Sequence, residues 1–328
     1  MSVRRFLVFG LQGSGKTTFA AALWHLLDSR EVPTALAKGR HTGNYRYLET
    51  IAQLWCDGWQ VERTKSEEVE DVRINLKHPT DGAEVALEFT DLAGESFEKA
   101  FVTRLCDETF VEIVNAAEGM LLFVSAQRVI DDVTILEAFG DGRDDEEVAM
   151  SELRIDDTAD GAAASAGPAA GPEASAAVIA EIQAADTHEP EDDDEEWDPA
   201  TAPHQVQLVD LLQALQQAPF EGRRLRVAVV ISAWDLSDGS APELWFAKRF
   251  PLLDQYLRNP QGALDLRVYG VSAQGGPLSQ KGTPATPDRD RLISIVPASK
   301  RVIIAGPNVA EHDITRPLYW LSGMEVGA

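Results

Sequence analysis

The sequence of 328 residues has few cysteines and no long apolar run. Its two cysteines, Cys56 and Cys106, are too few for a disulfide framework or for a zinc site with four cysteine ligands. No apolar stretch approaches the roughly 18 to 20 residues that a membrane-spanning helix needs, and the run FLVFGL near the N-terminus is too short for the core of a signal peptide. We therefore expect a soluble, cytoplasmic protein without a membrane span.

Basic residues are also scarce, because 29 lysines and arginines stand against 54 aspartates and glutamates and give a net charge of -25. The excess of acid is concentrated in residues 131–200, which hold 23 acidic and 2 basic side chains. The rest of the chain is nearly neutral, with 31 acidic and 27 basic side chains. Neither part offers the basic surface that attraction to a phosphate backbone requires, so we do not expect the protein to bind nucleic acid.

Strand-like and helix-like runs alternate outside the acidic segment, which is typical of a layered α/β domain. Segments 72–78 and 83–90 flank the turn-forming sequence PTDG and are expected to form an antiparallel hairpin. The other expected strands are 4–9, 119–126, 224–235, 266–272 and 301–305. The expected helices are 16–28, 45–55, 98–117, 206–217, 242–257 and the final RPLYWL.

Two segments lie outside this alternating pattern. From about Gly140 to His204 the sequence is rich in small residues, proline, glycine and acid, so it cannot bury enough apolar surface to offset its ordering entropy. We expect it to be disordered, either as a simple linker or as a ligand for a basic partner with Trp197 as an anchor. The amphipathic RPLYWL near the C-terminus is expected to dock on the protein's own sheet, with a second subunit as the alternative.

Residues 10 to 17 read GLQGSGKT, which is a complete GxxxxGK[ST] motif between an expected strand and an expected helix. The glycines allow backbone N–H groups to converge on phosphate oxygens, and the helix N-terminus adds partial positive charge. Lys16 would reach the β- and γ-phosphates, and the hydroxyl of Thr17 would ligate Mg²⁺. This motif alone does not distinguish ATP from GTP, or a kinase from a switch.

Three further motifs follow expected strands. Asp91 and Gly94 form a DxxG motif, in which the aspartate can hold Mg²⁺ through water and the glycine can present its N–H to the γ-phosphate. Asp235 ends the sequence VISAWD, and its carboxylate can accept hydrogen bonds from N1–H and the 2-amino group of guanine. Ser272, Ala273 and Gln274 lie at the end of the next strand, where the amide of Ala273 could donate to guanine O6. Ligands bind at such strand ends in open α/β sheets.

The sequence resembles the translation-factor-related class of P-loop GTPases over residues 4–137 and 205–305. Through GLQGSGKTTFAAAL, FTDLAGE and VISAWD it resembles more closely the bacterial double-GTPase proteins of biological-conflict systems. The class resemblance implies a three-layer fold with a mostly parallel six-stranded sheet and one antiparallel edge strand. It also implies a guanine nucleotide (GTP or GDP), Mg²⁺, and phosphate- and base-binding residues Gly10, Gly13, Ser14, Gly15, Lys16, Thr17, Thr18, Gly94, Asp235, Ser272 and Ala273.

The domain organisation that follows is a discontinuous G domain with two additions. The G domain comprises residues 1–137 and 205–305, the acidic insert 138–204, and the C-terminal amphipathic extension 306–328. The insert has no counterpart in a minimal G domain.

Two motifs depart from the pattern of the class. The base-recognition box is SAWD here, where NKxD is usual, so Trp234 either stacks on the base or, as its alternation with Asp235 favours, points into the interior. Glu95 follows DxxG where many members carry a glutamine that orients water. Its carboxylate lies unfavourably beside developing negative charge, so we expect slow turnover, although Glu95 could equally be an exposed residue that starts the next helix.

The first switch is expected to contribute a threonine to the Mg²⁺ site. Thr42, Thr50 and Thr64 are all available as Mg²⁺ ligands, and we favour Thr64 because it lies shortly before the hairpin. Arg63 beside it is either solvated or a catalytic arginine. The expected metal ligands are thus Thr17, Asp91 and Thr64, and the expected catalytic residues are Lys16, Glu95 and Thr64.

The sequence therefore predicts a GTP-binding switch with slow, Mg²⁺-dependent hydrolysis that controls a partner protein. The partner would be an effector or a second GTPase subunit, and the narrower resemblance implies a setting in bacterial defence. Two alternatives remain open, namely a nucleotide-loaded scaffold that does not hydrolyse and a P-loop ATPase or kinase.

Overall fold

A computed structural model describes most of the predicted G domain. The described residues are 3–40, 45–61, 72–89, 95–127 and 199–324. Contacts within the chain group residues 1–134 with 199–328 as one compact unit, while the second unit, 135–198, lies outside the described residues. The two halves of the first unit share a single sheet, because strands from before and after the insert are neighbours in it.

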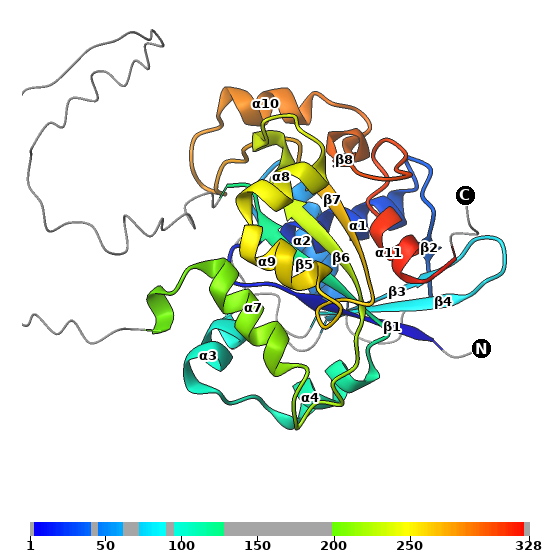
Figure 1. The fold of residues 1–328 in the computed structure, drawn as a ribbon. Coiled ribbons are helices and arrows are strands. Elements are labelled where there is room, and N and C mark those ends of the chain that lie inside the picture. The colour runs from blue at the N-terminus through cyan, green and yellow to red at the C-terminus, as the bar shows by residue number, and fades with distance from the viewer. Residues whose placement is uncertain (1–2, 41–44, 62–71, 90–94, 128–198, 325–328) are drawn as a thin grey trace, which may run out of the picture. The chain divides into compact units, whose positions relative to one another are not determined.

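Eight described strands form this sheet in the order β2-β3-β4-β1-β5-β6-β7-β8 (Figure 1). The bounds of the strands are β1 Arg4–Phe9, β2 Ala37–Lys38, β3 Val72–Lys77, β4 Glu84–Phe89, β5 Gly119–Ser125, β6 Arg226–Ser232, β7 Asp265–Ser272 and β8 Ile303–Ala305. The five strands from β4 to β7 in this order are parallel, and antiparallel pairs lie at both edges. The predicted α/β class and the 72–90 hairpin are confirmed.

The expected six-stranded sheet with one antiparallel edge strand is too small. At one edge the two-residue strand β2 pairs with β3, and at the other edge the three-residue strand β8 pairs antiparallel with β7. A strand of two residues has no periodicity that a sequence pattern could reveal. The expected strand 301–305 is real but begins only at Ile303, because Ala298–Arg301 form a short 3-10 helix, η3.

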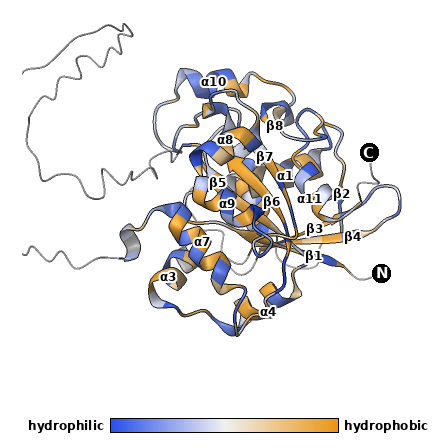
Figure 2. Ribbon diagram, in the orientation of Figure 1, coloured by the Kyte–Doolittle hydropathy of each residue, from blue (hydrophilic) through white to orange (hydrophobic). Residues whose placement is uncertain are grey.

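Helices cover both faces of the sheet and bury its apolar strands, which run orange through the centre of Figure 2. One face packs against α1, α2 and α11, and the other against α3, α4, α7, α8 and α9. Strands β5 and β6 are apolar almost throughout because both of their faces are covered. The bounds are α1 Lys16–Ser29, α2 Arg46–Cys56, α3 Glu95–Thr103, α4 Glu108–Ala116, α7 His204–Ala214, α8 Pro242–Arg249, α9 Pro251–Arg258, α10 Pro287–Ile293 and α11 Arg316–Leu321.

Two of the expected helices are each broken into two. The segment 98–117 divides at Arg104, whose φ of 59° ends α3, and Asp107 then caps α4 by accepting from the amide of Phe110. The segment 242–257 divides before Pro251, which opens α9 because it lacks the N–H needed in a helix interior. Helix α10 lies in the stretch between β7 and β8 where no helix was expected, and Thr286 caps it.

The ends of the predicted insert and extension also take part in the described structure. Residues 199–201 form the 3-10 helix η1, and Ala202 is buried, so these residues belong to the described structure although they precede the expected boundary at 205. Helix α11 docks on the protein's own sheet, as expected, with Leu318, Trp320 and Leu321 buried in the core. No helix among the described residues has both the length and the apolar character to cross a membrane.

Candidate functional site

The GxxxxGK[ST] segment forms the turn between the central strand β1 and helix α1. Gly10 has φ +154°, and a Cβ there would lie 2.9 Å from the carbonyl oxygen of Phe123. Gly15 has φ +92°, and a Cβ there would lie 2.6 Å from Cβ of Ser232. Both positions therefore require glycine, because the turn is pressed against the ends of β5 and β6 and has a backbone that other residues rarely adopt.

Lys16 is buried in this turn, with 2% of its surface exposed. Its Nζ donates to the carbonyl oxygens of Gly10, at 2.6 Å, and Leu11, at 3.0 Å. The ammonium group is thus held inside the curve of the loop. The amides of Gly13 and Gly15 make no hydrogen bond with any residue that the structure describes, so they are available to an anion.

The predicted base-binding residues also meet at the ends of neighbouring strands. Asp235 lies in the short 3-10 helix η2, Trp234–Leu236, which follows β6, and Ser272 is the last residue of β7. The hydroxyl of Ser272 donates to Oδ1 of Asp235 and accepts from the amide of Gly275 at 3.1 Å. Ser272 is fully buried, whereas Asp235 is exposed, so the buried hydroxyl fixes a carboxylate that faces outward.

A single large cavity of about 740 Å³ joins the two parts. Its walls include residues 12–19, from the turn and the start of α1, on one side. On the other side lie residue 232, which ends β6, and residues 233, 235 and 236, which follow it. Residues 271–274, at the end of β7, complete the base side. The structure therefore brings the predicted residues Gly13, Ser14, Gly15, Lys16, Thr17, Thr18, Asp235, Ser272 and Ala273 around one cavity. Parallel strands end at the same edge of a sheet, which is why segments so distant in sequence meet here.

Several predicted residues lie outside the described part of the chain. Asp91, Gly94, Thr42 and Thr64 are among them, as are Arg63 and Trp197. Glu95 is the first residue of α3, and its side chain is likewise not described. Their proposed roles remain predictions.

Two alternatives from the sequence can be decided. Thr50 lies in α2 with its hydroxyl donating to the carbonyl of Arg46 at 2.8 Å, and it does not line the large cavity, so its structure does not support a role as metal ligand. Trp234 is 7% exposed and packs edge-on against Trp245, with ring centroids 5.9 Å apart. It also covers Gly270 and is absent from the cavity wall, so it points into the interior and stacking on the base is wrong.

Other residues of the cavity wall were not found from the sequence. They include Gln60, Val61, Gln127, Leu236 and the run 276–278. The segments around residues 60 and 278 are joined because the amide of Gln60 donates to the carbonyl of Ser279 at 2.8 Å.

The glycine-rich turn also contacts Glu98 of α3, whose Oε1 accepts from the amide of Gln12 at 3.1 Å. No local motif marks these residues, because each contact joins distant parts of the chain.

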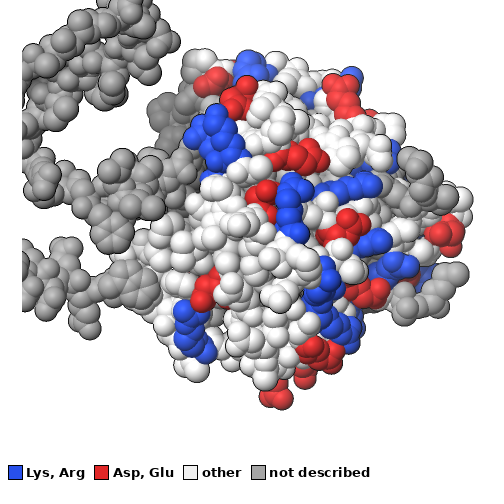
Figure 3. Space-filling model, in the orientation of Figure 1, with Lys and Arg blue, Asp and Glu red and all other residues white. Residues whose placement is uncertain are grey.

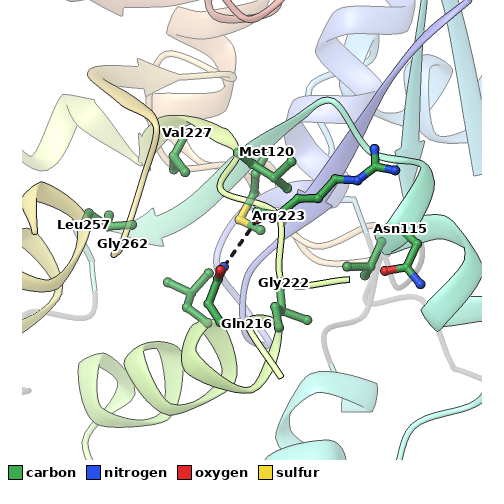
Figure 4. A pocket seen from close by; sticks show the side chains of 12 residues that line it. Asn115, Met120, Gln216, Gly222, Arg223, Val227, Leu257 and Gly262 are labelled. Carbon is green, nitrogen blue, oxygen red and sulfur yellow. Dashed lines mark hydrogen bonds between the residues drawn. The ribbon is translucent and has the colours of Figure 1, made fainter. Parts of the chain in front are cut away.

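A smaller cavity lies elsewhere, between the start of β5 and β6 and helix α7 (Figure 4). Its volume is about 30 Å³, and apolar groups such as Met120, Val227 and Leu257 line much of it. That space suits about one water molecule. None of the predicted site residues borders it, so the large cavity is the functional candidate.

The described residues supply only some of the oxygen ligands that a Mg²⁺ site would need. Thr17, in the first turn of α1, borders the large cavity and can supply a hydroxyl oxygen. No group of three or more His, Cys, Asp or Glu side chains that could hold a metal occurs among the described residues. The expected carboxylate ligand, Asp91, lies outside them.

The fold and the glycine-rich turn place this chain in the class of P-loop nucleotide-binding α/β proteins. The chain belongs to the Double-GTPase 1 family, whose model matches residues 7–321. This membership identifies it as a GTP-binding protein of the GTPase type. No curated protein matches it in sequence.

The solved structures that resemble the chain include two of the same yeast protein. Both are of the GTPase-like domain of Ski7 from S. cerevisiae, one bound to GTP and the other to GDP and inorganic phosphate. Identity is 12% and 13%, and the TM-scores are 0.37 and 0.36. Each match covers 83% of this chain but 43% of the Ski7 chain, so this chain matches under half the length of those proteins.

Proposed function

We propose that this protein is a molecular switch that binds GTP, hydrolyses it slowly with Mg²⁺, and controls a partner protein according to its nucleotide state. The observation that carries the proposal is the shared cavity between the Lys16 turn and the Asp235–Ser272 pair. One wall supplies backbone amides and an ammonium group, which suit phosphates, and the other supplies a fixed carboxylate, which suits the N–H edge of guanine.

The residues of this chain would divide the work as follows. Lys16 would exchange its carbonyl partners for the β- and γ-phosphate oxygens, while amides of the turn bind the remaining oxygens. Thr17, Asp91 and Thr64 would hold Mg²⁺, which would neutralise charge on the phosphates. Glu95 would lie near the attacking water, where its negative charge keeps turnover slow in the absence of a partner.

Family membership and the residues 91–94 support the switch role. A glycine that follows an aspartate by three residues can bind the γ-phosphate and release it after hydrolysis, so its segment can report the nucleotide state. The partner would be an effector or a second GTPase subunit, and the resemblance to double-GTPase proteins of conflict systems supports a setting in bacterial defence.

Binding of guanine nucleotides to purified protein tests the proposal. Titration with a fluorescent GTP analogue and Mg²⁺ should give saturable binding that GTP displaces and ATP does not. Lys16→Ala should abolish this binding, whereas Lys38→Ala, which removes a lysine paired with Asp28 outside the cavity, should leave it unchanged. Equal affinity of wild type and Lys16→Ala would contradict the proposal, provided that both variants melt cooperatively.

Single-turnover release of phosphate separates a switch from a scaffold. A slow release above the buffer control that requires both Mg²⁺ and the protein supports the switch. Binding of GTP without any release, even with partner proteins added, would establish the scaffold instead. Preferential binding of ATP would establish a P-loop ATPase or kinase.

A further inference from the structure

A tryptophan from α2 holds the loop that is predicted to read the base. Trp55 is 1% exposed, and its Nε1 donates to the carbonyl oxygen of Ala273 at 2.8 Å. Ala273 directly follows β7 and borders the large cavity. The indole therefore supports, from inside the protein, a residue whose other side faces the candidate ligand site.

Arg301 in turn fixes the end of α2 that carries Trp55. Its Nη1 donates to the carbonyl oxygens of Trp55, at 3.3 Å, and Cys56, at 2.9 Å. The guanidinium lies 5.6 Å from the centroid of the Trp55 ring, and Arg301 is only 5% exposed. Its backbone also meets the loop, because a Cβ on Gly275 would lie 2.4 Å from the carbonyl oxygen of Arg301.

These contacts restrain the backbone on both sides of the Ala273 amide. Before it, the hydroxyl of Ser272 is tied to both Asp235 and the amide of Gly275. After it, the carbonyl of Ala273 is tied to Trp55. With both neighbouring groups fixed and buried, the direction of the Ala273 N–H is set by the protein before any ligand arrives. A hydrogen bond to a preorganised donor costs the ligand less ordering entropy.

We infer that Trp55 is a positioning residue that sets the recognition of O6 of the guanine base. This inference rests on the proposed function, because it assumes that guanine occupies the cavity beside Asp235 and Ala273. Trp55 does not border the cavity and acts through the carbonyl of Ala273. Its removal should therefore weaken the contact with O6 while the contact of Asp235 with the 2-amino group is retained.

The test compares three nucleotides on wild type and Trp55→Phe, which keeps an aromatic ring but lacks the N–H donor. In 6-thio-GTP sulfur replaces O6 and is a weak acceptor, whereas ITP keeps O6 but lacks the 2-amino group. In Trp55→Phe the preference for GTP over 6-thio-GTP should fall by about threefold to tenfold, the range expected for one hydrogen bond. The preference for GTP over ITP should stay as in wild type.

A matched control is Trp320→Phe. Trp320 is 4% exposed and belongs to the same apolar cluster, but it lies in α11 and does not border the large cavity. Both preferences should be unchanged in this variant. If Trp55→Phe does not fold, replacing Trp55 by β-(3-benzothienyl)alanine, which keeps the bicyclic shape and lacks the N–H, gives the same comparison.

The outcomes separate the two proposals. If wild type binds no guanine nucleotide, the proposed function itself fails. If wild type binds GTP and loss of the indole N–H lowers the affinities for all three nucleotides equally, or lowers none, the role of Trp55 in recognition of O6 is overturned and the residue serves only packing.

Discussion

The backbone amide of Gln12 donates to Oε1 of Glu98, at 3.1 Å. Gln12 belongs to the phosphate-loop motif and borders the large cavity, while Glu98 lies in the first turn of α3. Helix α3 begins immediately after the DxxG segment, 91–94. A carboxylate from the helix after the DxxG segment is thus bonded to the loop that would bind phosphate.

The charge of Glu98 should disfavour the nucleotide that carries more negative charge. Glu98→Gln keeps an oxygen acceptor for the Gln12 amide and removes the charge, so it should raise the ratio of GTP to GDP affinity by about threefold, as expected for a partly screened charge nearby. Competition binding of GTP and GDP against one fluorescent nucleotide measures this ratio. Glu108→Gln, in the first turn of α4, is the control. A ratio unchanged by Glu98→Gln would show that the carboxylate does not sense the γ-phosphate.

Gly15 of the glycine-rich turn packs closely against Ser232, the last residue of β6. Gly15→Ala should destabilise the protein by about 2 to 4 kcal/mol, because it combines an unfavourable φ of +92° with a contact of 2.6 Å. Gly82→Ala is a matched control, since Gly82 has φ +71° and nothing within 4 Å, and it should cost only about 1 kcal/mol. Denaturant unfolding of each variant gives these free energies.

Removing the Ser232 side chain in the Gly15→Ala variant distinguishes steric crowding from backbone strain at position 15. Adding Ser232→Gly to Gly15→Ala removes the atom that the new Cβ would meet, so it should recover about 1 kcal/mol or more of the lost stability. Purely additive effects of the two substitutions would mean that the clash with Ser232 contributes nothing.

Asp235 should determine the choice of base. Asp235→Asn exchanges a double acceptor for an amide with one acceptor, so GTP affinity should fall by about tenfold to a hundredfold, without a matching fall in any affinity for ATP. Asp238→Asn changes an exposed carboxylate that accepts from Ser240 and does not border the cavity, and it should leave both affinities as they are. Parallel loss of GTP and ATP binding in Asp235→Asn would argue for a structural role instead.

Glu31 should contribute stability that depends on pH. Burial would raise its pKa, but hydrogen bonds from the amide and hydroxyl of Ser299, together with His25, outweigh burial and hold the pKa of Glu31 below its ordinary value of 4.5. A carboxyl with a depressed folded pKa stabilises the fold above its unfolded pKa, and this contribution is lost as pH falls through the folded value. Glu31→Gln removes this contribution and should lower the free energy of unfolding by about 0.5 to 1.5 kcal/mol at pH 7.

Urea unfolding of wild type and Glu31→Gln between pH 7 and pH 3 measures this dependence. The difference in unfolding free energy should be constant down to about pH 4.5 and then shrink. Glu112→Gln, an exposed change on α4, should give no such trend. A difference between wild type and Glu31→Gln that stays constant down to pH 3 would exclude Glu31 as the source.

The placement of charged residues on one face of the molecule agrees with the distribution of charge in the sequence. On the face drawn in Figure 3, basic and acidic side chains are interspersed over the described residues rather than gathered by sign. This pattern matches the near balance of 31 acidic and 27 basic residues outside 131–200. The sequence therefore predicted the character of this face, because the net charge is confined to one segment.

Strong periodic segments were predicted well. Strands β5 and β6 begin and end within three residues of their expected bounds, because short, unbroken and β-branched apolar runs suit strands covered on both faces. Helix breaks were missed at Arg104 and before Pro251, where one residue interrupts an otherwise helical pattern. Helix α10 was missed because it is short and lies within a stretch rich in glycine and proline.

The sequence by itself determined which chemical groups stand at the ends of the parallel strands, and with them the class of ligand. Those residues follow strands directly, so local spacing fixes where they lie. Only the tertiary structure decided what supports them. Trp55 under Ala273 is 218 positions away in sequence, and Glu98 beside Gln12 is 86 positions away. Such contacts leave no periodicity or motif, because they arise only when the sheet and its covering helices pack together.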